Sequence, residues 1–167
     1  MGRVSRMRKM KKPAIAVAIM LFALTSAGAA PAGDPVASDA QLKIAVAVAP
    51  DTVGAGLEAL VTVKLDPKPG IKLNKYPKIK LQIPAVSGLV GASEQSLGNT
   101  APPPADQLEA NYFREGVDPL SLTLHIDPQA AKGRHEIRGK LSYFYCVAAS
   151  GYCAPAKTEL TIPIIVR

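Results

Sequence analysis

The stretch HEIRGKLSYFYCVAASGYCAPAKTELTIPIIV, residues 135–166, decides the fold. Apolar and polar residues alternate over 135–145 and again over 158–166, which is the pattern of strands with one buried face. An uncharged loop that holds the chain's two cysteines, Cys146 and Cys153, separates these runs. The stretch therefore predicts two strands joined by a cysteine-containing loop.

The same period-two alternation recurs earlier in the chain. It is present in LKIAVAVA (42–49), LEALVTVKL (57–65), KIKLQI (78–83) and LSLTLHI (120–126), and weaker strands are expected near 88–97 and 107–113. Turn-forming segments separate the runs, and no segment keeps a 3.6-residue period. Six clear strands predict an all-β protein, an antiparallel β-sandwich of the immunoglobulin-like type. Because Pro163 lacks a backbone donor, we expect the last strand at a sheet edge or with a bulge.

The first 29 residues have the composition of a signal peptide. Basic residues precede the apolar run AIAVAIMLFAL, and small residues at 27–29 favour cleavage after Ala29. An uncleaved anchor is the alternative, but the apolar run is short for a membrane span. We expect a flexible lead-in over 30–40 and one domain over 41–167, exported to the periplasm and without a stable membrane span after cleavage.

Charge and motifs argue against several function classes. Six of the 20 Lys and Arg lie before residue 13, whereas all 13 Asp and Glu follow residue 29, so the chain from residue 30 carries only about +1. With no nucleic-acid-binding motif present, we expect no nucleic-acid partner. His125 and His135 flank a turn but fit no metal-site spacing, so we expect no metal and no other cofactor. No hydrolase or kinase motif is present.

The two cysteines allow two interpretations. The antibody-type disulfide joins distant strands and packs on a Trp, whereas these cysteines are seven positions apart in a chain without Trp. Closing so short a loop contributes only about 2.5 kcal/mol in the loop-closure model. An exposed or strained disulfide has the more oxidising potential that a redox relay requires. The alternative is an inert disulfide in a binding or structural module, for example in envelope assembly or copper handling.

A longer segment carries a family resemblance. GRHEIRGKLSYFYCVAASGYCAPAKTELTIPI, which begins at residue 133, resembles the C-terminal half of the N-terminal domain of DsbD, the thiol:disulfide interchange or disulfide-bond corrector family. In that family, a strand of the form G-x-H-x-(I/L)-x-G-x-L-x-Y runs into a cysteine, and a short loop closes on a second cysteine. NKYPKIKL at 74–81 is similar to a segment that recurs in such domains. The resemblance covers about residues 41–167.

The resemblance implies a thiol–disulfide interchange function. Cys146 and Cys153 take the positions of the family's redox-active disulfide, with Cys153 exchanging with partners and Cys146 as the resolving thiol. The implied partners are thioredoxin-like proteins or a membrane electron carrier. We expect a free-standing, monomeric domain that takes its electrons from another polypeptide.

Aromatic residues are expected to cover the disulfide. The family lays an aromatic cap over the sulfur atoms, and the resemblance places this cap in ANYFREG (110–116), with Tyr112 or Phe113 as the lid. Tyr152 stands beside Cys153, and we expect it to shield the sulfur.

Overall fold

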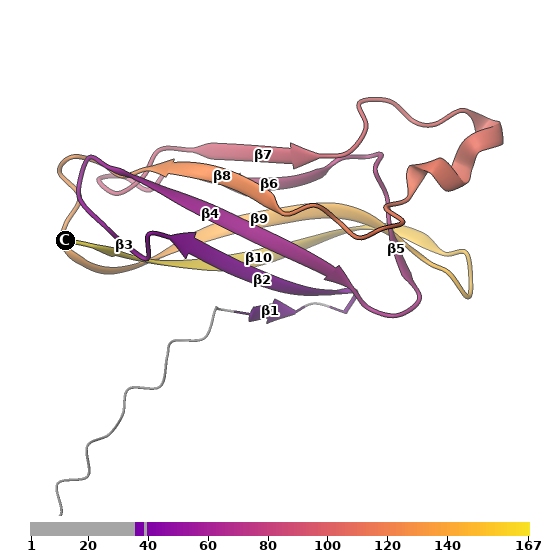
Figure 1. The fold of residues 1–167 in the computed structure, drawn as a ribbon, viewed down its shortest axis with the longest axis horizontal. Helices are drawn as coiled ribbons and strands as arrows, with labels where there is room; N and C mark the ends of the chain where they lie inside the picture. The colour runs from indigo at the N-terminus through magenta and orange to yellow at the C-terminus, as the bar shows by residue number, and fades with distance from the viewer. Residues whose placement is uncertain (1–35, 39) are drawn as a thin grey trace, which may run out of the picture. The chain divides into compact units, whose positions relative to one another are not determined.

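In the described part of the chain, ten strands form two sheets that pack face to face (Figure 1). The computed structural model describes residues 36–38 and 40–167, so the predicted signal peptide lies outside the described residues. The elements are β1 (Val36–Ser38), β2 (Leu42–Ala49), β3 (Thr52–Val53), β4 (Glu58–Pro67), β5 (Ile71–Leu73), β6 (Ile79–Ile83), β7 (Ser93–Leu97), the 3-10 segment η1 (Ala105–Asn111), β8 (Leu120–His125), β9 (Gly133–Val147) and β10 (Cys153–Val166).

The strand order is that of an immunoglobulin-like sandwich. One sheet has the order β1-β2-β4-β8, and the other has the order β3-β10-β9-β6-β7, with β5 also paired to β9. The β10–β3 pair is parallel, whereas the other strand pairs are antiparallel. A constant-type immunoglobulin fold divides its strands in a similar way, with A, B, E and D in one sheet and C, F and G in the other. The predicted all-β, immunoglobulin-like fold is confirmed.

The predicted alternation sets which side chains fill the core. All six clear strands are present, and β2, β4, β6 and β8 each follow their sequence pattern with alternating buried and exposed residues. The largest buried side chains are Leu42, Ile44, Leu73, Ile79, Leu81, Ile83, Leu120, Leu124, Ile137, Leu141, Leu160 and Ile162. Each such Leu or Ile contributes about 1.5–3 kcal/mol through burial, so together they contribute far more than the ~2.5 kcal/mol expected from the disulfide.

Pro163 occupies a position where its missing N–H costs no ladder hydrogen bond. Ile165 donates its N–H to Asp51, away from β9. Because backbone N–H groups alternate in direction along a strand, the nitrogen of Pro163 also points away from β9. Among the described residues, β10 pairs on that side only at Ile165 and Val166. The expected edge position of Pro163 is therefore confirmed.

Two segments differ from the sequence pattern. The weak strand expected near 107–113 is wrong, because η1 occupies most of this segment. Its residues, ADQLEAN, include no β-branched side chain, and three prolines precede them. The segment is interrupted at Gln107, whose φ of −126° is not helical. β1 lies inside the expected lead-in and pairs with β2. Within 36–38 and 40–167, no helix is long and apolar enough to cross a membrane.

Candidate functional site

The two cysteines form a disulfide between neighbouring strands. Cys146 on β9 lies directly opposite Cys153 on β10, and their Sγ atoms are 2.03 Å apart. The next pair toward the turn is joined by a hydrogen bond from Val147 N–H to the Tyr152 carbonyl. The cysteines therefore occupy a non-hydrogen-bonded pair, in which side chains approach most closely. The predicted disulfide is confirmed, and it lies within the paired strands.

The two sulfur-bearing residues differ in exposure. On β9 the odd-numbered Ile137, Leu141 and Tyr143 are buried in the core, so the even-numbered Cys146 projects from the outer face of the sheet. Cys146 is nevertheless only 3% exposed. Cys153 projects from the same face and is exposed. Another part of the chain must therefore cover Cys146 while leaving Cys153 accessible.

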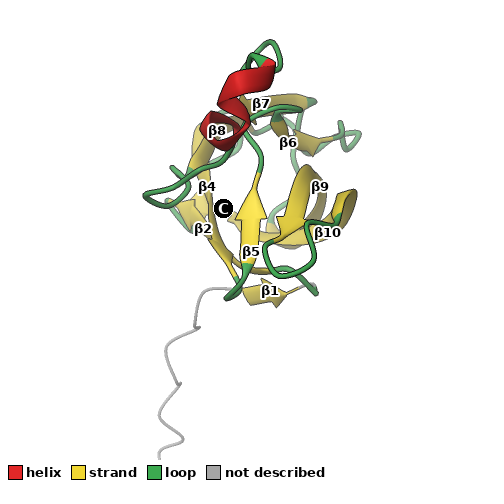
Figure 2. Ribbon diagram, turned by 90° about the vertical axis from the view of Figure 1, so that its right-hand side faces the viewer, coloured by secondary structure: helices red, strands yellow, loops and turns green. Residues whose placement is uncertain are grey.

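The cover consists of β5 and the segment that follows η1. β5 pairs with the end of β9, placing Lys72 opposite Cys146. Tyr112 lies beside Asn74 in an isolated antiparallel bridge, and its hydroxyl donates to Cys146 Sγ at 3.5 Å. Figure 2 shows β5, the β9–β10 hairpin and η1 gathered at the same end of the sandwich. We call residues 105–113, which comprise η1, Tyr112 and Phe113, the cap segment.

The NKYP motif anchors the cap segment. Lys75 donates its N–H to the carbonyl of Asn111. The Asn111 side chain then holds Tyr76 through two hydrogen bonds of 2.9 Å, accepting from its N–H and donating to its carbonyl oxygen. A side-chain amide that satisfies both backbone groups of one residue fixes the relative position of the two segments. This anchor holds the neighbouring Tyr112 at the disulfide.

Asn74, the first residue of the motif, contacts the disulfide itself. It is the only buried polar side chain among the described residues, at 6% exposure. Its Oδ1 atom lies 3.5 Å from Cys146 Sγ, and its backbone N–H donates to the Phe144 carbonyl. Cys146 Sγ therefore has two polar side chains around it, the hydroxyl of Tyr112 and the amide of Asn74.

The predicted aromatic residues have different positions. Tyr112 contacts the buried sulfur, whereas Phe113 donates its N–H to Leu73 and packs its ring against the core. Tyr152 is 60% exposed in the β9–β10 turn, where Ser150 Oγ accepts from its N–H. Of the two expected lid residues, Tyr112 is the one that the structure places at the disulfide. The shielding role of Tyr152 stays a prediction.

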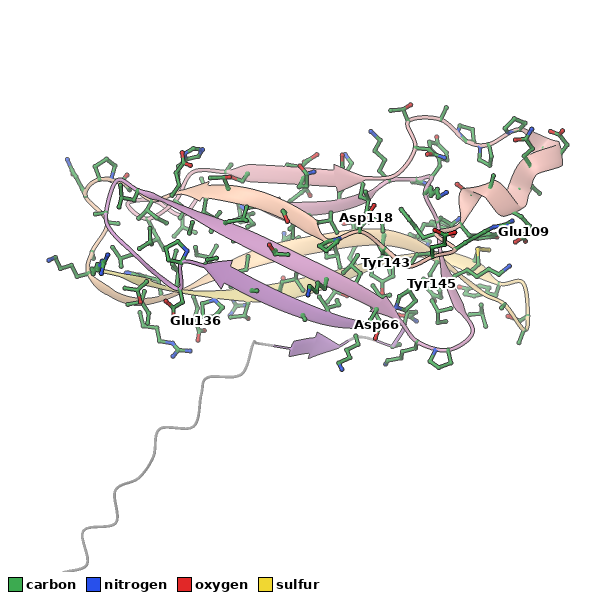
Figure 3. All side chains as sticks on the ribbon, viewed as in Figure 1. Asp66, Glu109, Asp118, Glu136, Tyr143 and Tyr145 are labelled. Atoms are coloured by element: carbon green, nitrogen blue, oxygen red, sulfur yellow. A yellow bond between two sulfur atoms is a disulfide. The ribbon has the colours of Figure 1, made fainter. Side chains whose placement is uncertain are left out.

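Lys72 and Arg114 approach Glu109, a carboxylate of the cap segment. Lys72 Nζ lies 3.2 Å from a Glu109 carboxylate oxygen and 4.7 Å from the centre of the Tyr112 ring. Arg114 approaches the same carboxylate at 4.0 Å. Figure 3 shows Glu109, a residue of η1, at the same end of the sandwich as Tyr145. The Lys72–Glu109 pair thus links β5 to η1 across the outer surface.

Because these groups are exposed, we expect their contribution to be small. Replacing Glu109 by Gln should lower the free energy of unfolding by no more than about 1 kcal/mol, since solvent screens exposed ion pairs. Urea unfolding of the wild type and of Glu109→Gln at low and high salt measures this contribution. The difference between the two proteins should shrink at high salt. A difference that persists at high salt would contradict a purely electrostatic link.

The two histidines lie in different sheets and contact other groups. His125 ends β8 in one sheet and pairs with Glu58 at 3.0 Å, whereas His135 lies on β9 in the other sheet and contacts the Ala131 carbonyl. Among the described residues, no group of three or more His, Cys, Asp or Glu side chains is arranged to hold a metal ion.

Comparisons with known proteins add one structural likeness. No protein-family model and no curated protein sequence matches the chain. Among solved structures, murine CRIg is similar with a TM-score of 0.36 and 11% sequence identity, over 74% of this chain and 98% of that chain. The immunoglobulin-like assignment therefore rests on the strand order described above.

Proposed function

We propose that the protein is an exported thiol–disulfide interchange domain. It relays electrons from a thioredoxin-like donor or a membrane electron carrier to periplasmic partners through the Cys146–Cys153 couple. The resemblance of the cysteine and NKYP segments to the N-terminal domain of DsbD supports this proposal. The observation that carries it is the unequal placement of the two sulfur atoms, one exposed at Cys153 and one covered at Cys146.

This placement favours one order of bond exchange. A partner thiolate attacks the exposed Sγ of Cys153, forming a mixed disulfide and breaking the Cys146–Cys153 bond. The bonding electron pair leaves on Cys146 Sγ, which then takes up a proton. The partner's second thiolate attacks its own bridged sulfur and releases Cys153 as a thiolate. The partner dithiol is thereby oxidised to a disulfide, and the domain's disulfide is reduced to two thiols.

The surroundings of Cys153 are suited to a partner protein that binds transiently. The residues from Cys146 to Ala156 include no Lys, Arg, Asp or Glu, so the hairpin itself presents no charged side chain to a partner. Among the described residues, the outer edge of the strand that Cys153 begins pairs with β3 only at the far end, around Ile165. The exposed sulfur therefore lies beside an unpaired strand edge, which leaves room for the partner in a transient mixed disulfide.

A redox titration tests the proposal. The wild-type protein is equilibrated in glutathione and dithiothreitol buffers of graded potential, and the fractions of dithiol and disulfide are read as the mass added by thiol alkylation. A relay couple should titrate above about −300 mV, within the range of thiol–disulfide exchange proteins. A couple that stays oxidised below that potential would identify the disulfide as structural and refute the relay.

A further inference from the structure

We infer that Asn74 and Tyr112 form a polar cradle around Cys146 Sγ that favours the reduced couple and selects Cys146 as the leaving sulfur. The inference deepens the proposed function and rests on it for the identity of the attacking partner. It starts from the one buried polar side chain among the described residues, Asn74, which faces Cys146 Sγ at 3.5 Å.

In the disulfide, no hydrogen bond can form from Cys146 to Asn74. A disulfide sulfur carries no hydrogen, so Asn74 Oδ1 receives no hydrogen bond from it. Reduction gives Cys146 an S–H group that donates to this oxygen at the same place. A thiolate is instead met by the amide NH₂ after a half-turn of the Asn74 side chain. A buried polar group gains stability when its hydrogen bond is completed, so Asn74 stabilises the reduced state more than the oxidised one.

Tyr112 acts in the same direction. Its hydroxyl donates to Cys146 Sγ at 3.5 Å. A disulfide sulfur is a weak acceptor, whereas a thiolate carries a full charge, and hydrogen bonds to charged groups are about twice as strong as neutral ones. The bond therefore strengthens as the electron pair moves onto Cys146 during attack at Cys153. Cys153 Sγ has a different environment, with the Gly151 carbonyl oxygen, an acceptor, at 3.6 Å.

The different surroundings of the two sulfur atoms give each a role in the exchange: Cys146 Sγ is the leaving sulfur and Cys153 Sγ is the attacked one. The Tyr112 hydroxyl and the Asn74 amide, which can both donate, lie around Cys146 Sγ, the sulfur that must accept the electron pair. The Gly151 carbonyl, an acceptor, lies beside Cys153 Sγ, the sulfur that is attacked.

Lys72 lies opposite Cys146 and holds the Tyr112 ring from outside, but its charge is shared with Glu109. The cradle is therefore built by Asn74 and Tyr112, with Lys72 as a positioning residue for the ring.

The test compares redox equilibria of matched variants. Asn74→Leu keeps a side chain of similar size without the amide, and Tyr112→Phe keeps the ring without the hydroxyl. In buffers at pH ~9.5, where cysteine thiols are largely thiolates, each should shift the dithiol–disulfide equilibrium toward the disulfide by about threefold to tenfold, from the loss of one hydrogen bond. A tenfold shift corresponds to about 30 mV for this two-electron couple. Thr161→Val removes an exposed hydroxyl from β10, opposite Arg138 and away from the disulfide, and should leave the equilibrium unchanged.

The outcomes separate the cradle from the proposed function. Equilibria of Asn74→Leu and Tyr112→Phe equal to the wild type, or shifted toward the dithiol, would overturn the cradle. An absolute potential in the structural range would refute the relay, while the differences among variants would still decide the cradle. If Asn74→Leu does not fold, as judged by circular dichroism of the oxidised protein, Tyr112→Phe decides alone because its packing is preserved.

Discussion

Cys146→Ser should form a stable mixed disulfide with a thioredoxin-like protein, whereas Cys153→Ser should form almost none. The probe is a thioredoxin-like protein whose second cysteine is replaced and whose first cysteine carries a thionitrobenzoate group. Attack by the domain's thiolate forms the mixed disulfide and releases coloured thionitrobenzoate, so the rate is read by absorbance. The exposed Cys153 of the first variant reaches this disulfide directly, but the 3% exposed Cys146 of the second lies under Tyr112.

The expected difference in rate is on the order of tenfold or more, because thiol reactivity follows access and thiolate character. The wild-type dithiol provides the control, since its Cys146 resolves the mixed disulfide and leaves the domain oxidised. Equal rates for the two single variants would contradict the assignment of Cys153 as the exchanging sulfur. The absence of any mixed disulfide with either variant would favour the inert-disulfide alternative.

The sheet could be predicted from sequence because its long strands obey a local rule. The alternation in LKIAVAVA places Leu42, Ile44 and Val46 on one face, and all three are buried. The short β5 was not predicted, because three residues are too few to show the alternation that indicates a strand. Its formation depends on pairing with β9, some 70 residues later in the chain. The strand expected near 107–113 fails for a local reason, because η1 has no β-branched residue and follows three prolines.

The candidate site, like the sheet, could be predicted only in part from the sequence. The cysteine pair is visible in the sequence, whereas the position of the cap region is implied by the family resemblance. The burial of Cys146 cannot be predicted, since alternation alone places it on the outer face of β9. The role of Asn74 is also hidden, because its contact with Cys146 spans 72 positions. The NKYP motif that Asn74 begins is visible in the sequence, but the contact of Asn74 with the sulfur is not.

The link between the NKYP motif and the cap has one position that tolerates no side chain. Gly98 follows β7 with φ +121°, and a Cβ added there would lie 2.1 Å from the Lys75 carbonyl oxygen. That oxygen accepts a hydrogen bond of 2.7 Å from Asn99, while the Lys75 N–H bonds to Asn111. Both backbone groups of Lys75 thus hold the two ends of the loop that carries the cap segment. Displacing Lys75 therefore loosens the whole loop.

Gly98→Ala should destabilise the domain and uncover Cys146. The positive φ alone costs about 1–3 kcal/mol for a non-glycine residue, and the collision with Lys75 adds to it. Gly116→Ala is the matched control, because Gly116 has φ +98° but an added Cβ meets nothing within 4 Å. Urea unfolding should show a larger loss for Gly98→Ala than for Gly116→Ala.

The effect on Cys146 is measured in a Cys153→Ser background, where Cys146 is the single thiol. Alkylation of Cys146 by iodoacetamide should be roughly tenfold faster or more with Gly98→Ala, since local opening exposes buried groups. With Gly116→Ala it should stay near the background rate. Because Gly98 lies away from the sulfur in sequence, faster alkylation would show that the cap is held through Lys75. If alkylation is unchanged despite a loss of stability, Tyr112 stays on Cys146 through its own contacts and does not depend on the hydrogen bonds of Lys75.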